Sequence, residues 1–316
     1  MEGGECAICG RNADSNPFLQ AWVAGFHFQY RRCKSCGLVF LNPRPGVQEI
    51  GQFYDEEYYG GGRQKFRDWI ETLRLYFARR RASRMKRFFP GGGRALDLGC
   101  GQGTFLELLR KEGWEVQGTE RSPDSACRAR LSGLPVSVGE VQRGQFPDHS
   151  LDLVTLWQVI EHLYDPAVLM RRIHPMLRNG GMVAISTPNI ESLQARVFRE
   201  KWFHLDPPRH LYLFSPQTLE RLMNREGFRL VALNHLSWEQ NPYGWLQSFL
   251  NRMGSANGSL YAYLKNLPPS RDPKGSLSGK NLLLAAGLLP FCFLLPLILE
   301  RSGGGGTFEA YFGKET

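Results

Sequence analysis

Residues 94–109 read Arg-Ala-Leu-Asp-Leu-Gly-Cys-Gly-Gln-Gly-Thr-Phe-Leu-Glu-Leu-Leu. A short apolar run ends in an acid at Asp97, three glycines follow at alternate positions, and Thr104 begins an amphipathic helical pattern. Glycine lets the backbone turn tightly and lie against a ligand because it has no Cβ. We therefore predict a strand, a glycine turn and a helix N-terminus, which form a nucleotide-binding crevice at the carboxyl end of a parallel sheet.

The rest of the chain after this stretch alternates strand and helix patterns, as a doubly wound sheet requires. One of the helices is expected at 165–177, after the fourth strand. We predict an α/β fold with a mostly parallel, seven-stranded sheet, in which the last two strands pair antiparallel. The seven expected strands are 95–98, 116–119, 136–138, 151–156, 182–186, 228–236 and 307–312.

The pattern Asp-x-Gly-x-Gly-x-Gly differs from the G-x-G-x-x-G of dinucleotide folds, and an acid before the first glycine suits a cationic ligand better than a phosphate. It resembles motif I of the class I S-adenosylmethionine-dependent methyltransferases. Residues 177–189, Leu-Arg-Asn-Gly-Gly-Met-Val-Ala-Ile-Ser-Thr-Pro-Asn, resemble the same family. The resemblance covers about residues 94–236 and implies a Rossmann-like methyltransferase domain with S-adenosylmethionine as cofactor. The alternative is a glycine-rich turn in another α/β protein.

The resemblance also implies which residues hold the cofactor. The glycine loop would accommodate its methionine part, with Asp97 near the ammonium. Glu120 stands about twenty residues after the first glycine, at the tip of the second strand, where an acid accepts ribose hydroxyls; the alternative is a surface glutamate. Glu140 matches the acid near the adenine. The predicted cofactor-binding residues are Asp97, Gly99, Cys100, Gly101, Gly103, Glu120, Glu140 and Gln158.

Residues 157–162, Trp-Gln-Val-Ile-Glu-His, follow the fourth strand, where a base for the acceptor is expected. They resemble the Glu-x-x-Glu-His signature of the ubiquinone-type O-methyltransferases, in which two acids and the histidine can hold a divalent metal. Gln158 replaces the first acid, and a neutral amide binds hard cations more weakly, which argues against a catalytic metal. We predict His162 as general base with Glu161 orienting it; the alternative is a pair that packs under the acceptor.

A third candidate catalytic residue is His210, in the segment 202–215. This segment looks like the lid after the fifth strand in bacterial methyltransferases encoded with cell-envelope polysaccharide genes. There His210 would face the acceptor.

Four of the seven cysteines form two C-x2-C pairs, Cys6 with Cys9 and Cys33 with Cys36, separated by 23 residues. Such pairs supply four thiolates for a tetrahedral zinc ion. Residues 22–31 alternate like a hairpin strand between the pairs. We predict a small zinc ribbon whose metal is structural; the alternative is that the cysteines are unrelated.

Residues 63–94 contain eleven Lys or Arg and two acids, Asp68 and Glu71. The net charge of this segment is therefore +9, the same as that of the whole chain. Aromatic and aliphatic residues recur at helical spacing from Phe66 to Phe77, including Leu73 and Tyr76. We therefore predict an amphipathic helix with a cationic outer face. That face is either simply solvated or attracts phosphates of anionic lipid, a nucleotide-sugar or RNA.

Residues 282–299 carry no charge and are long enough to span a membrane. A single span is excluded if the sixth and seventh strands are sheet neighbours, because they would lie on opposite sides of the bilayer. Pro290 and Pro296 also interrupt a straight helix. We predict an insertion that makes monotopic or peripheral membrane contact; the alternative is an internal helical cap or a dimer surface.

The sequence thus predicts four parts: a zinc module (1–45), a linker with the basic helix (46–92), a methyltransferase domain (93–240 with 305–316) and an insertion (241–304). The expected activity is O-methylation of a small-molecule or lipid-linked saccharide in cell-envelope biosynthesis. RNA methylation, sugar C-methylation and a cofactor-binding scaffold without turnover are the alternatives. A nucleic acid partner is disfavoured because the positive charge is confined to one helix. Residues 1–10 are polar and contain two cysteines, so they do not resemble an export signal. We therefore expect the protein in the reducing cytoplasm, at the inner face of the cytoplasmic membrane.

Overall fold

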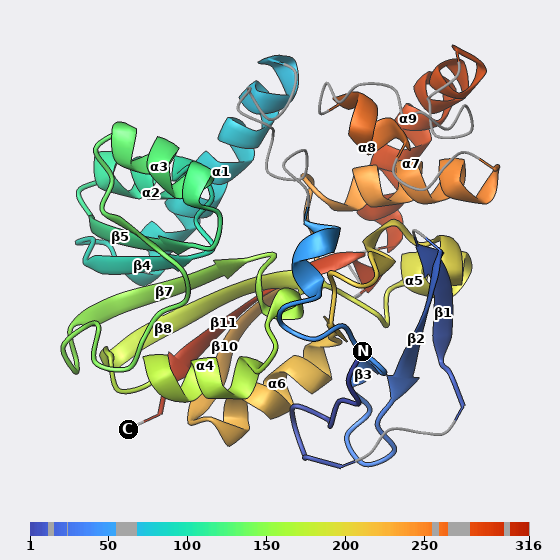
Figure 1. Ribbon diagram of the computed structural model, residues 1–316. Helices are drawn as coiled ribbons and strands as arrows, with labels where there is room; N and C mark the ends of the chain where they lie inside the picture. Colours follow the sequence, from blue (N-terminus) through green and yellow to red (C-terminus); the bar gives the residue numbers. More distant parts are fainter. Residues whose placement is uncertain are drawn as a thin grey trace. The chain divides into compact units, whose positions relative to one another are not determined.

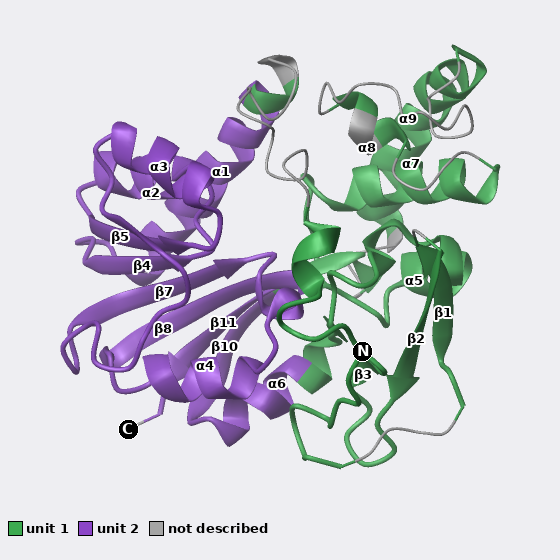
Figure 2. Cartoon of the chain, in the orientation of Figure 1, with its two compact units in different colours: residues 1–71, 188–218, 234–308 green, residues 72–187, 219–233, 309–316 purple. Residues whose placement is uncertain are grey.

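The computed structural model describes residues 1–11, 16–23, 25–54, 68–254, 259–264, 279–299 and 304–315. They form two compact units, each of which is described by itself (Figure 2). Unit 1 comprises residues 1–71, 188–218 and 234–308, and unit 2 comprises residues 72–187, 219–233 and 309–316. This division differs from the four parts expected from the sequence. The predicted lid and the predicted insertion both belong to the same unit as the cysteine module.

Unit 2 is built on a seven-stranded sheet with the order β10-β11-β8-β7-β4-β5-β6 (Figure 1). The pairs β7–β8, β7–β4, β4–β5 and β5–β6 are parallel. All seven expected strands are present, and the predicted doubly wound, mostly parallel fold is confirmed. The strands are β4 (Arg94–Leu98), β5 (Glu115–Glu120), β6 (Val136–Val138), β7 (Leu151–Trp157), β8 (Leu177–Pro188), β10 (Phe228–Asn234) and β11 (Thr307–Lys314).

Helices cover both faces of this sheet. The core on one face joins α1, α2 and α3 to the strands, and it includes the fully buried Met85, Leu109 and Ala126. Helices α4 and α6 lie along the other face (Figure 1). Helix α4 ends earlier than expected, because Pro175 has no N–H to continue the hydrogen bonding of the helix. The helices are α1 (Asp68–Phe88), α2 (Thr104–Lys111), α3 (Pro123–Leu131), α4 (Pro166–Ile173) and α6 (Pro216–Arg225).

Helix α1 buries a different face from the one that the sequence pattern suggested. Leu73 and Tyr76 are exposed, whereas Ala78, Ala82 and Met85 are buried against the sheet. Two alanines on the inner face let the helix lie close to the strands, which large aromatic side chains would prevent. The predicted amphipathic helix therefore exists, but its apolar face was wrongly assigned. Residues 55–67 of the aromatic and basic stretch lie outside the described part of the chain.

Unit 1 contains a four-stranded sheet with the order β1-β2-β3-β9. The predicted hairpin is present as the antiparallel pair β1–β2. Strand β9 comes from the predicted lid and pairs antiparallel with β3, with Phe40 opposite Tyr212 and Val39 opposite Leu213. A segment far along the chain thus completes the sheet of the cysteine module. The strands are β1 (Leu19–Val23), β2 (Phe26–Arg32), β3 (Val39–Leu41) and β9 (Tyr212–Leu213).

The region predicted as an insertion forms three of the helices of unit 1, α7, α8 and α9. Asn241 begins α7, and its Oδ1 accepts hydrogen bonds from the backbone N (2.9 Å) and Oγ1 (3.0 Å) of Thr307. Helix α9 packs along α7. Residues 255–258, 265–278 and 300–303 of the predicted insertion lie outside the described residues. The helices are α5 (Leu193–Phe198), α7 (Asn241–Arg252), α8 (Ser259–Leu264) and α9 (Gly279–Leu299), with short 3-10 turns η1 (Ile50–Phe53), η3 (Arg199–Lys201) and η4 (Phe203–Leu205).

Candidate cofactor and acceptor site

Asp97 lies near the end of β4, at the start of the glycine loop of unit 2. Its Oδ1 accepts a hydrogen bond of 2.6 Å from Oγ1 of Thr155 on the neighbouring strand β7. Burial raises the pKa of Asp97 to about 7, although the hydrogen bond from Thr155 and the positive charge of Arg81 act in the opposite direction. A buried carboxylate of this kind gains most from a cationic partner, because an opposite charge lowers the cost of ionisation.

Three glycines with positive φ form the loop: Gly99 (+69°), Gly101 (+58°) and Gly103 (+82°). A Cβ on Gly99 would lie 2.7 Å from Cγ2 of Val159, and a Cβ on Gly103 would lie 2.3 Å from Cδ1 of Leu134. A Cβ on Gly101 would meet no atom within 4 Å. The outer two glycines therefore serve packing, whereas Gly101 presents bare backbone to an open space that a ligand can enter.

Glu120, at the end of β5, closes the other side of the loop. It is buried, and its two carboxylate oxygens accept backbone hydrogen bonds of 2.8 Å, one from Gly101 and one from Ser122. Each oxygen keeps a further lone pair for a donor such as a ribose hydroxyl. Two acidic side chains around one loop disfavour a phosphate ligand, but they fit the ammonium and the ribose hydroxyls of S-adenosylmethionine.

Arg81 adds a cation to the same side of unit 2. Its guanidinium carbon lies 5.3 Å from the ring centre of Trp157, which contacts Phe105 edge to face. The sequence placed Arg81 only among the residues of a cationic face, because its position depends on how α1 packs. Its positive charge also acts on Asp97 and lowers the pKa of that carboxyl.

Gln158 and Glu140 hold surface or strand-end positions. Gln158 has a positive φ of 58°, its backbone N donates to the carbonyl of Ser186 (2.9 Å), and its Nε2 donates to Oγ of Ser186 (2.9 Å). The Glu140 side chain is largely exposed and lies 3.7 Å from the guanidinium of Arg172. The cofactor-binding roles of Gln158, Glu140 and Cys100 stay predictions.

Glu161 and His162 lie on the short turn η2 (Ile160–His162), which follows β7. Glu161 is fully buried, and it accepts a hydrogen bond of 3.0 Å from Oγ1 of Thr187 at the end of β8. The carboxylate is therefore held in a fixed position beside a histidine. Their catalytic roles stay predictions.

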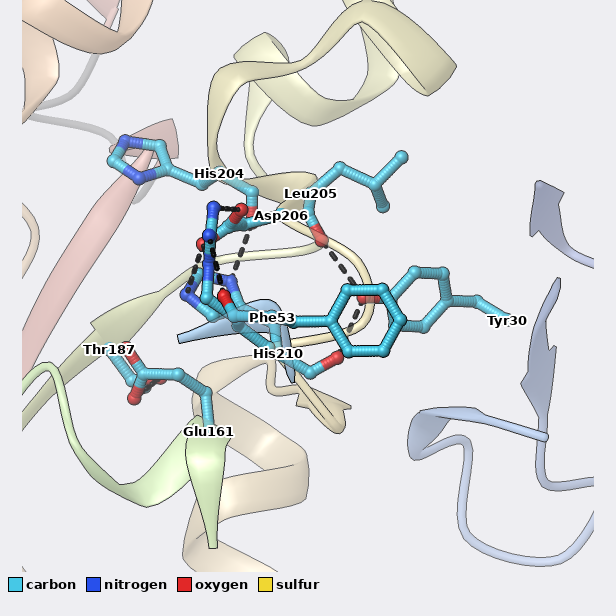
Figure 3. Close-up of polar contacts among 9 residues, drawn as sticks. Tyr30, Phe53, Glu161, Thr187, His204, Leu205, Asp206 and His210 are labelled. Carbon is cyan, nitrogen blue, oxygen red and sulfur yellow. Dashed lines mark hydrogen bonds and ion pairs between the residues drawn. The ribbon is translucent and has the colours of Figure 1, made fainter. Parts of the chain in front are cut away.

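His210 belongs to unit 1, in the segment after η4 (Figure 3). Its Nδ1 lies 2.8 Å from the carbonyl oxygen of His204, and burial lowers its pKa to about 4 although the charge of Asp206 raises it. His210 is thus neutral at pH 7, and its Nδ1 donates to this carbonyl, so Nε2 is the basic nitrogen. Its predicted catalytic role stays a prediction.

Tyr30 anchors this histidine segment to the four-stranded sheet, a role that the sequence did not suggest. Its hydroxyl lies 2.9 Å from the carbonyl oxygen of Leu205 and 2.7 Å from that of His210, and the whole side chain is buried (Figure 3). The Tyr30 hydroxyl therefore fixes the backbone on both sides of Asp206, which is ion-paired with Arg209.

A family model of a methyltransferase domain matches residues 63–233, which is more than half of the chain. The chain belongs to this methyltransferase family. The match includes the glycine loop, Glu120 and the Glu161–His162 turn. The cysteine module lies outside it.

Curated relatives of the methyltransferase domain include two proteins named ubiquinone biosynthesis O-methyltransferase. The one from Aeromonas salmonicida is 37% identical over 106 residues, which are 31% of this chain and 44% of that protein. The one from Pseudomonas aeruginosa is 32% identical over 105 residues, which are 31% of this chain and 45% of that protein. The chain thus spans less than half the length of these relatives.

Solved structures share the fold of the methyltransferase at low identity. The (4+2)-cyclase SpnF has a TM-score of 0.51 and 17% identity, over 86% of this chain and 97% of that one. A candidate sarcosine dimethylglycine methyltransferase from Galdieria sulphuraria has a TM-score of 0.51 and 16% identity, over 84% of this chain and 97% of that one. These similarities show the fold alone.

The four cysteines of the N-terminal module converge, as their spacing predicted. The Sγ atoms of Cys6 and Cys36 are 3.3 Å apart, those of Cys9 and Cys33 are 3.4 Å apart, and all four lie within 4.8 Å of one another. Each knuckle closes with a glycine of positive φ. Four sulfurs at these separations fit the corners of a tetrahedral zinc site, in which Zn–S distances are about 2.3 Å.

Proposed function

We propose that this methyltransferase transfers the methyl group of S-adenosylmethionine to a hydroxyl oxygen of its acceptor. The observation that carries the proposal is the pair of buried carboxylates, Asp97 and Glu120, on either side of the bare backbone of Gly101. When bound, the cofactor supplies a methyl group on a positively charged sulfur. The family match and the names of the curated relatives support the same reaction.

The residues of the glycine loop would hold the cofactor by charge and shape. Asp97 would pair with its ammonium, Glu120 would accept its ribose hydroxyls, and Arg81 would pair with its carboxylate. Calorimetric titration with S-adenosylmethionine tests this arrangement. We expect Arg81→Gln to weaken binding at least tenfold and Arg79→Gln, an exposed neighbour on the same helix, to leave it unchanged. Equal affinities of both variants would contradict the role of Arg81.

The acceptor hydroxyl must lose its proton as the methyl group is transferred. His162 is the proposed base, and Glu161, held by Thr187, would orient it. A His162→Gln variant should keep its affinity for S-adenosylmethionine and lose most of its turnover. If it keeps its turnover, the base is another residue.

The proposed acceptor is a saccharide or lipid-linked glycan intermediate of cell-envelope biosynthesis, used at the inner face of the cytoplasmic membrane. The names of the curated relatives favour a second candidate, an acceptor in ubiquinone biosynthesis. Incubation with methyl-labelled cofactor and a total lipid extract separates the two. Mild acid releases the label as a water-soluble sugar from a glycolipid, whereas label on a quinone precursor stays in the organic phase.

The other readings of the sequence receive less support from the described residues. Three basic residues of α1 contact parts of unit 2: Arg84 pairs with Glu309, Lys86 pairs with Glu112, and Arg81 covers Trp157. They contribute less to a surface for RNA than their number suggests. One of the solved structures with this fold is named as a cyclase, so the fold alone does not determine which reaction is catalysed. A scaffold without turnover would bind the cofactor and transfer no label to any fraction of a lysate.

The proposed metal of the N-terminal module is one structural zinc ion held by Cys6, Cys9, Cys33 and Cys36. The convergence of their sulfurs supports it, since four buried or partly buried thiols with no disulfide suit a thiophilic metal. Elemental analysis of the purified protein should find one zinc per chain. Replacement of Cys33 by serine should remove it, and replacement of the exposed Cys127 should not.

A further inference from the structure

Helix α9 is the most apolar helix among the described residues. The most apolar 18-residue window within residues 279–298 has a mean hydropathy of 2.2, and only 17% of that window is buried. By length and composition it could cross a membrane. A helix that is apolar all round normally lies inside a large protein or in lipid. Here most of it is covered by neither α7 nor another described element of unit 1.

The two sides of α9 differ in their contacts but not in their chemistry. Ala285, Cys292 and Pro296 are buried, at spacings of seven and four that place them on one side. This side faces α7, where Phe291 also contacts Phe249. The remaining sides expose only apolar residues, glycine and proline between 282 and 298. The large side chains exposed there are Leu282, Leu283, Leu289, Leu294 and Ile298, whereas Phe291 and Phe293 are partly exposed and contact Phe249 and Trp238.

Strand order limits how this helix can meet a bilayer. The chain from 235 to 306 leaves β10 and returns to β11, and these strands are neighbours in one sheet. Both ends of α9 must therefore return to the same side of a membrane. A chain that crosses the membrane once needs a second spanning helix to return, and α9 is the one helix among the described residues that could span. A crossing by α9 is therefore excluded. Pro290 and Pro296 within it also weaken a straight span.

The chemistry of the exposed face favours lipid over a protein partner. Protein interfaces carry about one hydrogen bond per 100–200 Å². The face of α9 offers no side-chain donor or acceptor from 282 to 298. Lys280, at its start, is exposed, and its ammonium is attracted to anionic headgroups. The preceding residues 265–278, which lie outside the described part of the chain, contain two lysines and one arginine against one aspartate.

We propose that α9 lies in the plane of one leaflet of a bilayer that contains anionic lipid, with α7 on its protein side and Lys280 at the headgroups. The attachment is monotopic: unit 1 stays on one side of the membrane and no segment crosses it. This proposal depends on α9 and on the order of the strands. It does not depend on the proposed methyl transfer.

Vesicle flotation of the purified full-length chain tests the proposal. The vesicles contain phosphatidylcholine with about 30% phosphatidylglycerol, or phosphatidylcholine alone. The test variant carries glutamate at Leu283, Leu294 and Ile298, which are 78%, 54% and 73% exposed. The matched control carries glutamate at Leu131, Val47 and Val231, which are 83%, 61% and 56% exposed and lie outside α9.

We expect the wild-type chain and the control to float with anionic vesicles, and the α9 variant to float at least tenfold less. Neutral vesicles should bind the wild type more weakly. Hydrogen exchange in residues 204–213 checks that unit 1 of all three proteins is folded, and titration with S-adenosylmethionine checks unit 2. A failure of flotation with normal cofactor binding would leave the proposed methyl transfer intact. The proposal is overturned if the wild type stays with the soluble fraction, or if the α9 variant floats normally. It is also overturned if light scattering shows a dimer that the α9 variant breaks while neither protein floats.

Discussion

Asp97 links cofactor binding to pH at the scale of a single residue. Burial raises its pKa from 3.8 to about 7, so the side chain is mostly protonated below pH 7. An ammonium ligand pairs with the ionised form, and binding must then displace a proton. We predict that the affinity for S-adenosylmethionine is highest near pH 7.5, where both Asp97 and the ligand's ammonium are largely charged, and falls about tenfold per pH unit between pH 6.5 and 5. Calorimetry across this range measures it; a flat profile would contradict the pairing.

The same carboxylate should cost folding stability. Because the pKa of Asp97 is raised in the folded state, its contribution to stability is present below pH 3.8 and is lost as the pH rises through 7. We predict that Asp97→Asn, which can still accept the hydrogen bond from Thr155, stabilises the cofactor-free chain by at most about 4 kcal/mol at pH 8 and by less at pH 5. Urea unfolding at the two pH values measures the difference. A variant that is less stable than the wild type at pH 8 would refute this account.

Gly101 and Gly103 are glycines for different reasons: Gly101 leaves space for a ligand, and Gly103 allows close packing against Leu134. Gly103→Ala places a Cβ 2.3 Å from Leu134 in a left-handed backbone, and we expect it to cost about 2 kcal/mol or more of stability. Gly101→Ala meets no protein atom, so it should cost only about 1 kcal/mol of backbone strain. It should nevertheless weaken S-adenosylmethionine binding more than tenfold, because the new methyl group enters the open space. Denaturant unfolding and calorimetry on both variants decide; equal stability losses would contradict the division.

At the same scale, the sequence predicted those residues that carry a local signal. The strand, the acid and three alternating glycines identify the loop, and strand-end spacing identifies Glu120. The sequence analysis did not single out Arg81 or Tyr30, because neither residue has such a local signal. Arg81 was one arginine among eleven basic residues, and its place over Trp157 depends on the packing of α1. Tyr30 acts on carbonyls about 175 residues away in the chain.

At the scale of elements, Tyr30 on β2 holds the backbone that carries His210. Loss of its hydroxyl leaves two buried carbonyls without this donor. We predict that Tyr30→Phe costs about 1–3 kcal/mol of stability in unit 1. Tyr76→Phe, on the exposed face of α1, should cost less than about 0.5 kcal/mol. Hydrogen exchange should report faster opening of residues 204–211 in Tyr30→Phe alone. Unchanged exchange there would show that other contacts hold the segment.

Elements with strong periodicity were predictable and those made by packing were not. The seven strands of the large sheet follow from apolar runs and turns. Strand β9 has only two residues and shows no pattern, so its pairing with β3 is visible only in three dimensions. Helix α1 was expected, but its inner face is set by small residues. The hydrophobic pattern favoured Leu73 and Tyr76, whereas close contact with the sheet selects Ala78 and Ala82.

At the scale of the whole molecule, each unit is assembled from three stretches of chain. The predicted linear order of a zinc module, a linker, a domain and an insertion misses this interleaving, because sequence patterns report neighbours along the chain. The cysteine module, the His210 segment and α7–α9 belong to one compact unit, and we expect them to unfold together. A substitution at one of the cysteines should therefore also destabilise segments of unit 1 that lie far along the chain.

Removal of zinc tests that consequence. The proposed metal holds both cysteine knuckles, and the knuckle of Cys33 and Cys36 joins β2 to β3. Strand β3 pairs with β9, and next to this pair the backbone N of Leu41 donates to the carbonyl of Leu211 (2.8 Å). We predict that a chelator, or Cys33→Ser, accelerates hydrogen exchange in residues 26–41 and also in 211–213. Exchange in β4 and β7 should not change, and the affinity for S-adenosylmethionine should stay within about twofold, because those strands belong to unit 2. Exchange that accelerates in 26–41 alone would show that β9 is held by other contacts, and acceleration in β4 would show that the two units unfold together.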